Sequence, residues 1–233
     1  MNRSPWPYDK KPLLVFWETT KACLLKCIHC RAEAIKKPLP GELTTKEGLR
    51  LLEMIADFGK PSPILVFTGG DPLMREDIWK LLEYAKNLGI RTAIAPSVTP
   101  LLTPSVIDKL SNYVSAVSLS LDSPYPEVHE EIRGIHGIWE KTLKALLQFR
   151  ENGVRVQVNT VVMKKTVDGL PEMVKLLLDN DIKTWEVFYL IPVGRGDRKH
   201  DLTPDEWEDV SHFLYEASRY GLRIRTVEGP IFR

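Results

Sequence analysis

Three cysteines, Cys23, Cys27 and Cys30, lie within eight positions of a 233-residue chain that contains no other cysteine. An odd number of thiols so close together is a poor framework for disulfides. Thiolates on one short loop can instead converge on a metal centre. A four-iron cluster normally takes four cysteine ligands, so a cluster held by these three would leave one iron free to bind another molecule.

Zinc is the main alternative metal, because His29 next to Cys30 could complete a Cys3His set of the kind found in structural zinc sites. Adjacent residues cannot easily point at one ion, however, and paired zinc ligands usually lie roughly two to four residues apart. Three buried thiols without a metal are a further alternative. A single buried thiol is common, whereas three at this spacing in a polar loop are not. We therefore expect an iron–sulfur cluster.

The elements that must position these thiols are predicted from hydrophobic periodicity. Short apolar segments rich in Val, Ile, Leu and aromatic residues predict buried strands, because they are too short for buried helices. They are Leu13 to Glu18, Ile64 to Thr68, Thr92 to Ala95, Ala116 to Leu121, Val156 to Val162 and Trp185 to Leu190. A seventh strand is expected at Leu222 to Val227.

Helices are expected between the strands. Thr44 with Glu47, and Thr203 with Glu206, form capping boxes that mark two helix starts, and Thr103 precedes a proline at a third. Further helices are predicted over 75–88, 139–151 and 170–179. Alternating strands and helices predict an α/β fold with a parallel sheet, either a partial (β/α)6 barrel or an open doubly wound sheet. In both folds ligands bind at the C-terminal ends of the strands.

The cysteine loop follows the first predicted strand, and C-x3-C-x2-C in that place resembles the signature loop of the radical S-adenosylmethionine (radical SAM) superfamily. The resemblance implies a partial TIM-like barrel. It also implies that Cys23, Cys27 and Cys30 hold a 4Fe-4S cluster whose fourth iron binds S-adenosylmethionine (SAM). His29 takes the place where the family usually has an aromatic residue.

Other segments resemble motifs of the family in the same order. Thr68-Gly69-Gly70-Asp71-Pro72 resembles a Gly-Gly-Glu-Pro motif that contacts the methionine amino group, with Asp71 in place of glutamate. The segment from Leu190 to Gly196 resembles the one whose backbone holds adenine. The residues expected to contact SAM are Gly69, Gly70, Asp71, Pro72, Ser120, Asp122, Arg133, Asn159, Leu190 and Ile191.

Individual roles follow from the resemblance and from side-chain chemistry. Ser120 and Asp122 resemble ribose-binding positions, and Arg133 lies where relatives keep an arginine for the methionine carboxylate, although a surface arginine beside two glutamates is nearly as plausible. Asn159 must be hydrogen-bonded either to the cofactor or to a neighbouring strand. Ser118 is expected to face solvent. The loop at Arg195 is expected to be open and mobile.

The chemistry that the resemblance implies is reductive cleavage of SAM to a 5′-deoxyadenosyl radical, which then removes hydrogen from a substrate. An external one-electron donor of the ferredoxin or flavodoxin type is implied as a partner. Thr19 to Cys23 and Val193 to Gly196 resemble the branch that carries a C-terminal SPASM extension. That branch acts on tetrapyrroles, peptides and cofactor precursors. The non-radical alternatives are a zinc-stabilised binding module and a non-catalytic peptide-binding scaffold.

Three parts of the chain are expected: an N-terminal arm over 1–12, a core domain over 13–220, and the start of a truncated C-terminal extension over 221–233. No cysteine follows Cys30, so no auxiliary cluster can be assigned.

Composition predicts an ordinary globule, with 43% hydrophobic residues and a net charge of +1 from 32 basic and 31 acidic residues. This balance predicts no nucleic-acid partner. No apolar stretch approaches the roughly 20 residues of a membrane span, and no signal peptide is recognisable, so we expect a cytoplasmic protein without a membrane partner.

Overall fold

A computed structural model describes residues 6–229 of the chain. Seven strands form one sheet in the order β1-β2-β3-β4-β5-β6-β7, and each pairs in parallel with the next. The strands are β1 (Leu14–Glu18), β2 (Ile64–Thr68), β3 (Thr92–Ile94), β4 (Ala116–Ser120), β5 (Arg155–Val162), β6 (Thr184–Tyr189) and β7 (Arg223–Val227). The predicted α/β class, the six βα units and the seventh strand are therefore confirmed.

The helices that cross between the strands begin largely where capping residues predict. The helices are α1 (Thr45–Ala56), α2 (Ile78–Asn87), α3 (Pro104–Ser111), α4 (Pro126–Arg133), α5 (Ile138–Glu151), α6 (Leu170–Asp179) and α7 (Pro204–Ser218). Both predicted capping boxes are formed, at Thr44 and at Thr203. Helix α4 was not predicted, although Pro126 in its first turn and the left-handed Gly134 at its end are ordinary signals of a helix.

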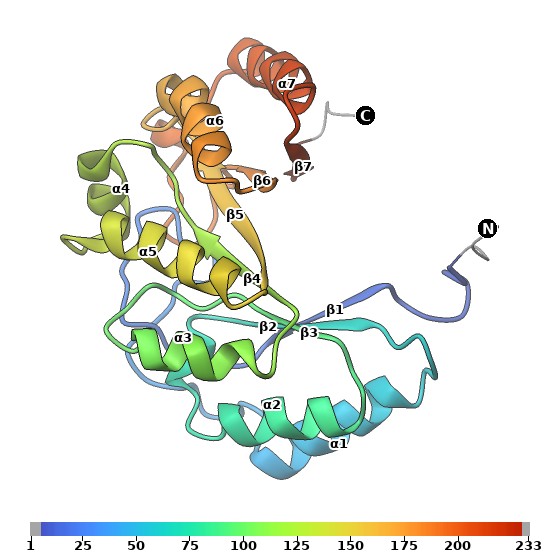
Figure 1. Cartoon of the computed structure of the whole chain (residues 1–233). Coiled ribbons are helices and arrows are strands. Elements are labelled where there is room, and N and C mark those ends of the chain that lie inside the picture. Colours follow the sequence, from blue (N-terminus) through green and yellow to red (C-terminus); the bar gives the residue numbers. More distant parts are fainter. Residues whose placement is uncertain (1–5, 230–233) are drawn as a thin grey trace.

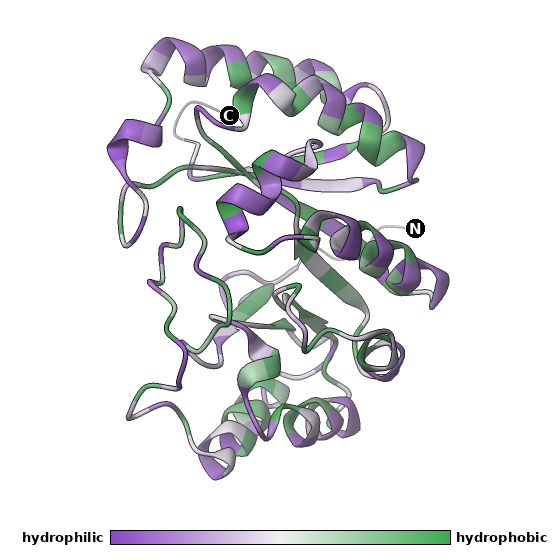
Figure 2. Ribbon diagram, turned by 90° about the vertical axis from the view of Figure 1, so that its left-hand side faces the viewer, coloured by the Kyte–Doolittle hydropathy of each residue, from purple (hydrophilic) through white to green (hydrophobic). Residues whose placement is uncertain are grey.

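The sheet curls into an arc, with the helices along its outer side and with β1 and β7 at its two ends (Figure 1). The ends are not paired with each other in the described residues, so the structure is a half-barrel. Figure 2 shows the same arrangement coloured by hydropathy: hydrophilic residues lie along the outer surfaces of the helices, and the strands are more hydrophobic. This is the pattern expected when helices bury one apolar stripe against a sheet.

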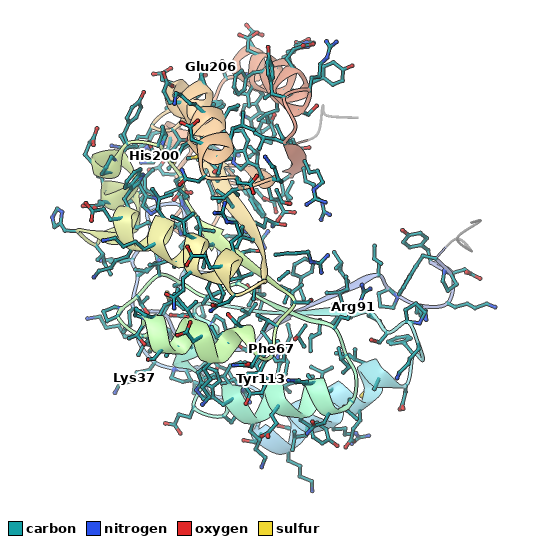
Figure 3. The ribbon with its side chains drawn as sticks, in the orientation of Figure 1. Lys37, Phe67, Arg91, Tyr113, His200 and Glu206 are labelled. Atoms are coloured by element: carbon teal, nitrogen blue, oxygen red, sulfur yellow. The ribbon has the colours of Figure 1, made fainter. Side chains whose placement is uncertain are left out.

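The hydrophobic core lies between the sheet and the helices. Phe67 and Trp185 are fully buried there, and Phe67 lies on the side of the sheet that the helices cover (Figure 3). Trp17 packs on the same side, against Phe67 at 5.7 Å between ring centroids. Alternation along β1 therefore places Phe16, which is 64% exposed, on the inner, concave side of the arc.

The loops at the N-terminal ends of the strands differ from those at the C-terminal ends. Arg91, directly before β3, and Lys37, in the long loop after β1, lie at opposite ends of the sheet (Figure 3). Short 3-10 turns follow β2 and β6 at the end where Lys37 lies; they span Pro72–Met74 and Arg198–His200. The connections at this C-terminal end are the ones that build the site.

The described part of the N-terminal arm is tied to the body of the protein. The Lys11 ammonium donates to the Pro61 carbonyl at 2.8 Å, and the Trp6 indole donates to the Lys11 carbonyl at 3.2 Å. The first five residues of the expected arm and the last four of the expected extension lie outside the described residues. The division of the chain into three parts therefore stays a prediction.

Candidate functional site

The three cysteines lie on the loop after β1 and border one cavity of about 210 Å³. Cys23 and Cys27 are buried, Cys30 is partly exposed, and all three thiols are free. The cavity lies over the C-terminal ends of the middle strands, where Thr68, Ala95, Ser118 and Ser120 also border it. The three cysteines therefore border the same cavity at this end of the sheet, and their role as metal ligands stays a prediction.

The backbone of the cysteine loop packs directly on the two glycines after β2. A Cβ atom on Gly69 would collide with the Thr20 carbonyl, and one on Gly70 would collide with the Ala22 carbonyl. Amide hydrogen bonds fix this approach, from Gly70 to the Thr20 carbonyl at 2.6 Å and from Asp71 to the Ala22 carbonyl at 2.7 Å. The bare glycines therefore serve first to seat the cysteine loop, while both still border the cavity.

Asp71 is fully buried and does not border the cavity. Its carboxylate accepts from the amides of Leu73 at 3.1 Å and Ser97 at 3.3 Å, and from the Thr99 hydroxyl at 3.3 Å. Burial raises the pKa of Asp71 to about 6, against these hydrogen bonds. Asp71 thus joins the loop after β2 to the loop after β3. Pro72, also buried, begins the 3-10 turn behind it.

Ser97 connects this framework to the first cysteine. Its hydroxyl donates to the Gly70 carbonyl at 3.2 Å and lies 3.4 Å from the Cys23 sulfur. Burial raises the pKa of the Cys23 thiol, while the Ser97 hydrogen bond opposes that effect. Sequence reasoning missed Ser97, because nothing in the loop after the third predicted strand distinguishes one hydroxyl from its neighbours.

Arg133, at the end of α4, reaches the second cysteine. Its Nη1 donates to the Cys27 sulfur at 3.5 Å, while its Nε and Nη2 both lie 2.7 Å from one oxygen of Asp122. Burial alone would raise the pKa of the Asp122 carboxyl, but the Arg133 charge and the hydrogen bond with His29 hold it well below its usual range. Arg133 borders the cavity and Asp122 lies behind it.

Two histidines complete the surroundings of Asp122. The Asp122 amide donates to His129 Nδ1 at 3.1 Å, and His29 Nε2 lies 3.4 Å from the Asp122 carboxylate. His29 borders the cavity next to the thiols. Sequence reasoning gave His129 no role. Its position one helical turn before Arg133 would have placed both side chains on one face, had α4 been predicted.

The strand residues divide into those that border the cavity and those that do not. Ser120 and Asn159 are register partners on β4 and β5, and both border it. Ser118 borders it as well, so the expectation that Ser118 merely faces solvent was wrong. Thr160 is instead buried between strands, where it donates to the Leu121 carbonyl at 2.6 Å and accepts from the Trp185 indole at 2.8 Å.

The segment after β6 was expected to contact SAM through Leu190 and Ile191, but neither residue borders the cavity. Leu190 is buried in a small cluster with Ile132 and Met163. The loop that follows is not open. Arg195 binds the cysteine loop through three hydrogen bonds and borders the cavity itself. Sequence reasoning missed this, because the contact spans most of the chain.

The arrangement of the thiols bears on the kind of metal centre that they could hold. Among the residues that the structure describes, no three His, Cys, Asp or Glu side chains lie close enough to share one metal ion. A structural zinc ion needs four such ligands within roughly 2.0–2.3 Å. Thiols distributed around a cavity suit an iron–sulfur cluster, in which several irons share the ligands. Three free thiols around one cavity therefore fit the predicted cluster.

A parallel half-barrel with three free thiols around a cavity at its C-terminal end defines a class of α/β protein that holds a cluster of iron and sulfur. The sequence profile of the Radical SAM superfamily matches residues 17–177. The chain belongs to this superfamily, whose members use a 4Fe-4S cluster and SAM as cofactors.

Several curated relatives are named for the synthesis of heme or Fe-coproporphyrin III. The chain is 35% identical over 205 residues to the AdoMet-dependent heme synthase of Oleidesulfovibrio alaskensis, with 87% of this chain and 52% of that protein covered. It is 34% identical over 214 residues to the Fe-coproporphyrin III synthase of Methanosarcina barkeri, covering 91% and 52%. The chain thus spans about half the length of the curated relatives it matches.

The fold is similar to that of SuiB from Streptococcus suis. The structure of SuiB bound to S-adenosylmethionine superposes with a TM-score of 0.79 at 23% identity, covering 94% of this chain and 51% of SuiB. A structure of SuiB bound to the precursor peptide SuiA gives a TM-score of 0.78, with 94% and 49% covered.

None of the helices within residues 6–229 of the present chain is long and apolar enough to cross a membrane.

Proposed function

We propose that the chain binds SAM at the iron its three cysteines leave free and, on receiving one electron, breaks the C5′–S bond of SAM. Methionine and a 5′-deoxyadenosyl radical result, and the radical takes a hydrogen atom from a substrate, leaving a substrate radical. The cluster supplies the electron transfer and the free iron. The observation that carries the proposal is that Cys23, Cys27 and Cys30 border one cavity together with Gly70, Ser120 and Arg133.

We propose distinct tasks for the side chains around the cavity. Arg133 can hold the methionine carboxylate, since its guanidinium borders the cavity beside the Cys27 sulfur. Ser120 and Asn159 can hydrogen-bond the ribose hydroxyls from adjacent strands. Asp122 was expected at the ribose, but its carboxylate is engaged by Arg133. It therefore acts by positioning Arg133.

The segments around β2 and β6 supply backbone groups in this proposal. Carbonyls of Gly69 and Gly70 accept from the methionine ammonium at the cavity wall. Asp71 and Pro72 hold that wall in place from behind. The backbone of Leu190 and Ile191 holds adenine at the rim, so their absence from the cavity wall is compatible with a cofactor that extends beyond it.

The concave side of the sheet offers a place for the substrate next to this cavity. On one half, Phe16, Val66, Ala93 and Ala116 form one apolar row across β1 to β4. On the other half, Asn159, Glu186 and Arg225 form a polar row across β5 to β7. A surface that is apolar on one side and polar on the other suits a molecule with an apolar body and polar edges.

We propose a tetrapyrrole as the substrate, because such a molecule has a flat apolar ring with polar substituents and because the relatives are named for heme and Fe-coproporphyrin III synthesis. A peptide is the second candidate, since SuiB, which shares the fold, holds a precursor peptide. An external donor of the ferredoxin or flavodoxin type is proposed to supply the electron.

The proposed activity is tested by anaerobic reconstitution of the chain with iron and sulfide. About four irons per chain are expected, together with 5′-deoxyadenosine after reduction in the presence of SAM. Cys27→Ala should lose both, because it removes one of three ligands. Ser218→Ala, a change at an exposed hydroxyl, is the control and should retain both. A colourless protein with one zinc ion, or normal SAM cleavage by Cys27→Ala, would overturn the proposal.

A further inference from the structure

Arg195 lies in the segment after β6, far from the cysteines in sequence, and is hydrogen-bonded to the cysteine loop. Its amide donates to the Cys30 carbonyl at 3.0 Å, its Nε to the Cys27 carbonyl at 2.9 Å and its Nη1 to the Ala34 carbonyl at 3.0 Å. Gly194 permits this approach, because a Cβ atom there would lie only 2.7 Å from the Cys30 carbonyl. The guanidinium is planar, so with two of its nitrogens bound, the position of the third is set as well.

That third nitrogen, Nη2, is buried and has no hydrogen-bond partner. Leaving a buried donor unpaired costs about 1–3 kcal/mol, and more when the donor is charged. Such a group in a native structure points to an acceptor that binds there. Arg195 borders the same cavity as the three thiols, so a cofactor held by those thiols can supply this acceptor.

The charges around the cavity point to the same acceptor. Of the two arginines on the cavity wall, Arg133 is paired with the Asp122 carboxylate at 2.7 Å. Arg195 has no acidic partner within the described part of the chain, since its bound nitrogens all face backbone carbonyls. Its positive charge is therefore uncompensated next to Cys27 and Cys30, whose sulfur atoms would carry negative charge as ligands of a cluster.

We propose that Arg195 donates its Nη2–H to a sulfur atom of the cluster and thereby raises the reduction potential of the cluster. The proposal rests on the proposed function, since it requires the three cysteines to hold a cluster. Reduction adds negative charge to the sulfurs, so a hydrogen bond and an uncompensated positive charge there stabilise the reduced form more than the oxidised form. Arg195 is a positioning residue for the cysteine loop and also sets the energy of the electron-transfer step.

The test is a redox titration of the reconstituted chain without SAM, followed by optical and electron paramagnetic resonance spectroscopy. Arg195→Gln removes the charge and should disfavour reduction by about tenfold, a shift of about 59 mV to more negative potential for a one-electron couple. Arg195→Lys retains the charge and should shift the potential less. Arg198→Gln, at an exposed arginine three positions further on, removes a charge that does not border the cavity and should leave the potential unchanged.

Loss of the loop contacts lowers cluster occupancy in these variants but does not obscure the result, because the potential is measured on the fraction that holds a cluster. An unchanged potential in Arg195→Gln would overturn the inference, and so would a shift that appears only after SAM is added, which would place Nη2 on SAM. Both outcomes leave SAM cleavage by the unmodified chain intact. Failure of the unmodified chain to assemble a cluster would instead refute the proposed function.

Discussion

Asp122 and Arg133 form a buried ion pair, and this pair fixes the position of the Arg133 guanidinium next to the Cys27 sulfur. The carboxylate is held from three directions, by Arg133, by His29 and by the Val161 amide at 3.1 Å. These contacts leave Arg133 one nitrogen for the Cys27 sulfur. A change at Asp122 therefore acts on the cavity through Arg133.

Asp122→Asn should destabilise the chain without cofactors by about 3–5 kcal/mol at neutral pH, because it leaves the Arg133 charge buried and unpaired. The pKa of Asp122 is lower in the folded chain than in the unfolded chain, so its contribution is present above about pH 4 and is lost as pH falls further. The difference in unfolding free energy between the two proteins should thus shrink in acid. Urea unfolding at several pH values measures it.

Glu140→Gln is the matched control, since Glu140 pairs with Lys144 at the surface, where both side chains are more than 70% exposed. This change should cost less than about 1 kcal/mol. If the Asp122→Asn deficit were as small, or if it grew as the pH fell, the buried pair would not have the role assigned to it.

At the scale of elements, the cysteine loop has almost no regular structure of its own and takes its shape from neighbours. The segment after β2 seats it through Gly69 and Gly70, and the segment after β6 holds it through Arg195. Helix α4 supplies a further contact at Cys27. Segments that are far apart in the sequence thus hold one short loop in place.

Gly70→Ala should displace the cysteine loop, because its Cβ atom would collide with the Ala22 carbonyl. Overpacking of this kind costs about 1–3 kcal/mol. We expect a lower melting temperature and fewer irons per chain after reconstitution.

The comparison is Gly59→Ala, which has a positive φ of +74° but open space around the added carbon. It should cost about 1 kcal/mol and leave the iron content unchanged. Equal iron content in both variants would show that Gly70 does not seat the loop.

The elements were predictable because their signals are local. The capping boxes at Thr44 and Thr203 depend on residues three positions apart, and both are formed. Helix α4 was missed although Pro126 and Gly134 signal it, because its eight residues are mostly polar. The spacing of the three cysteines, and the family resemblance that it carries, were enough to predict that they lie together at one site. The contact from Arg195 to Cys27 could not be predicted, because it depends on how β1 and β6 are placed within the curved sheet.

At the scale of the whole molecule, the half-barrel leaves its concave side accessible between β1 and β7. Phe16 is 64% exposed on this side, in a row with Val66 on β2. Phe16 and Val66 lie side by side on this face, and an exposed apolar patch is typical of a binding surface. The proposed substrate would cover it.

Phe16→Ala should weaken binding of Fe-coproporphyrin III by about tenfold, because burial of a phenylalanine side chain is worth about 1.5–3 kcal/mol. The shift of the tetrapyrrole absorption band on titration with protein measures the affinity. Phe58→Ala removes a ring that is 44% exposed in the turn after α1 and should have no effect. Equal affinities for both variants would show that the substrate does not bind on the concave side of the sheet.

The contact between Arg195 and Cys27 joins residues 168 positions apart, and this separation has a consequence for biosynthesis. A ribosome adds about 5–20 residues per second, so Cys27 is synthesised roughly 10 to 30 s before Arg195. During that interval nothing from the sixth strand shields the thiols. The cysteine loop therefore gains its Arg195 contacts only after the segment that follows β6 has been made, and we expect its sulfurs to be more open to oxygen before then.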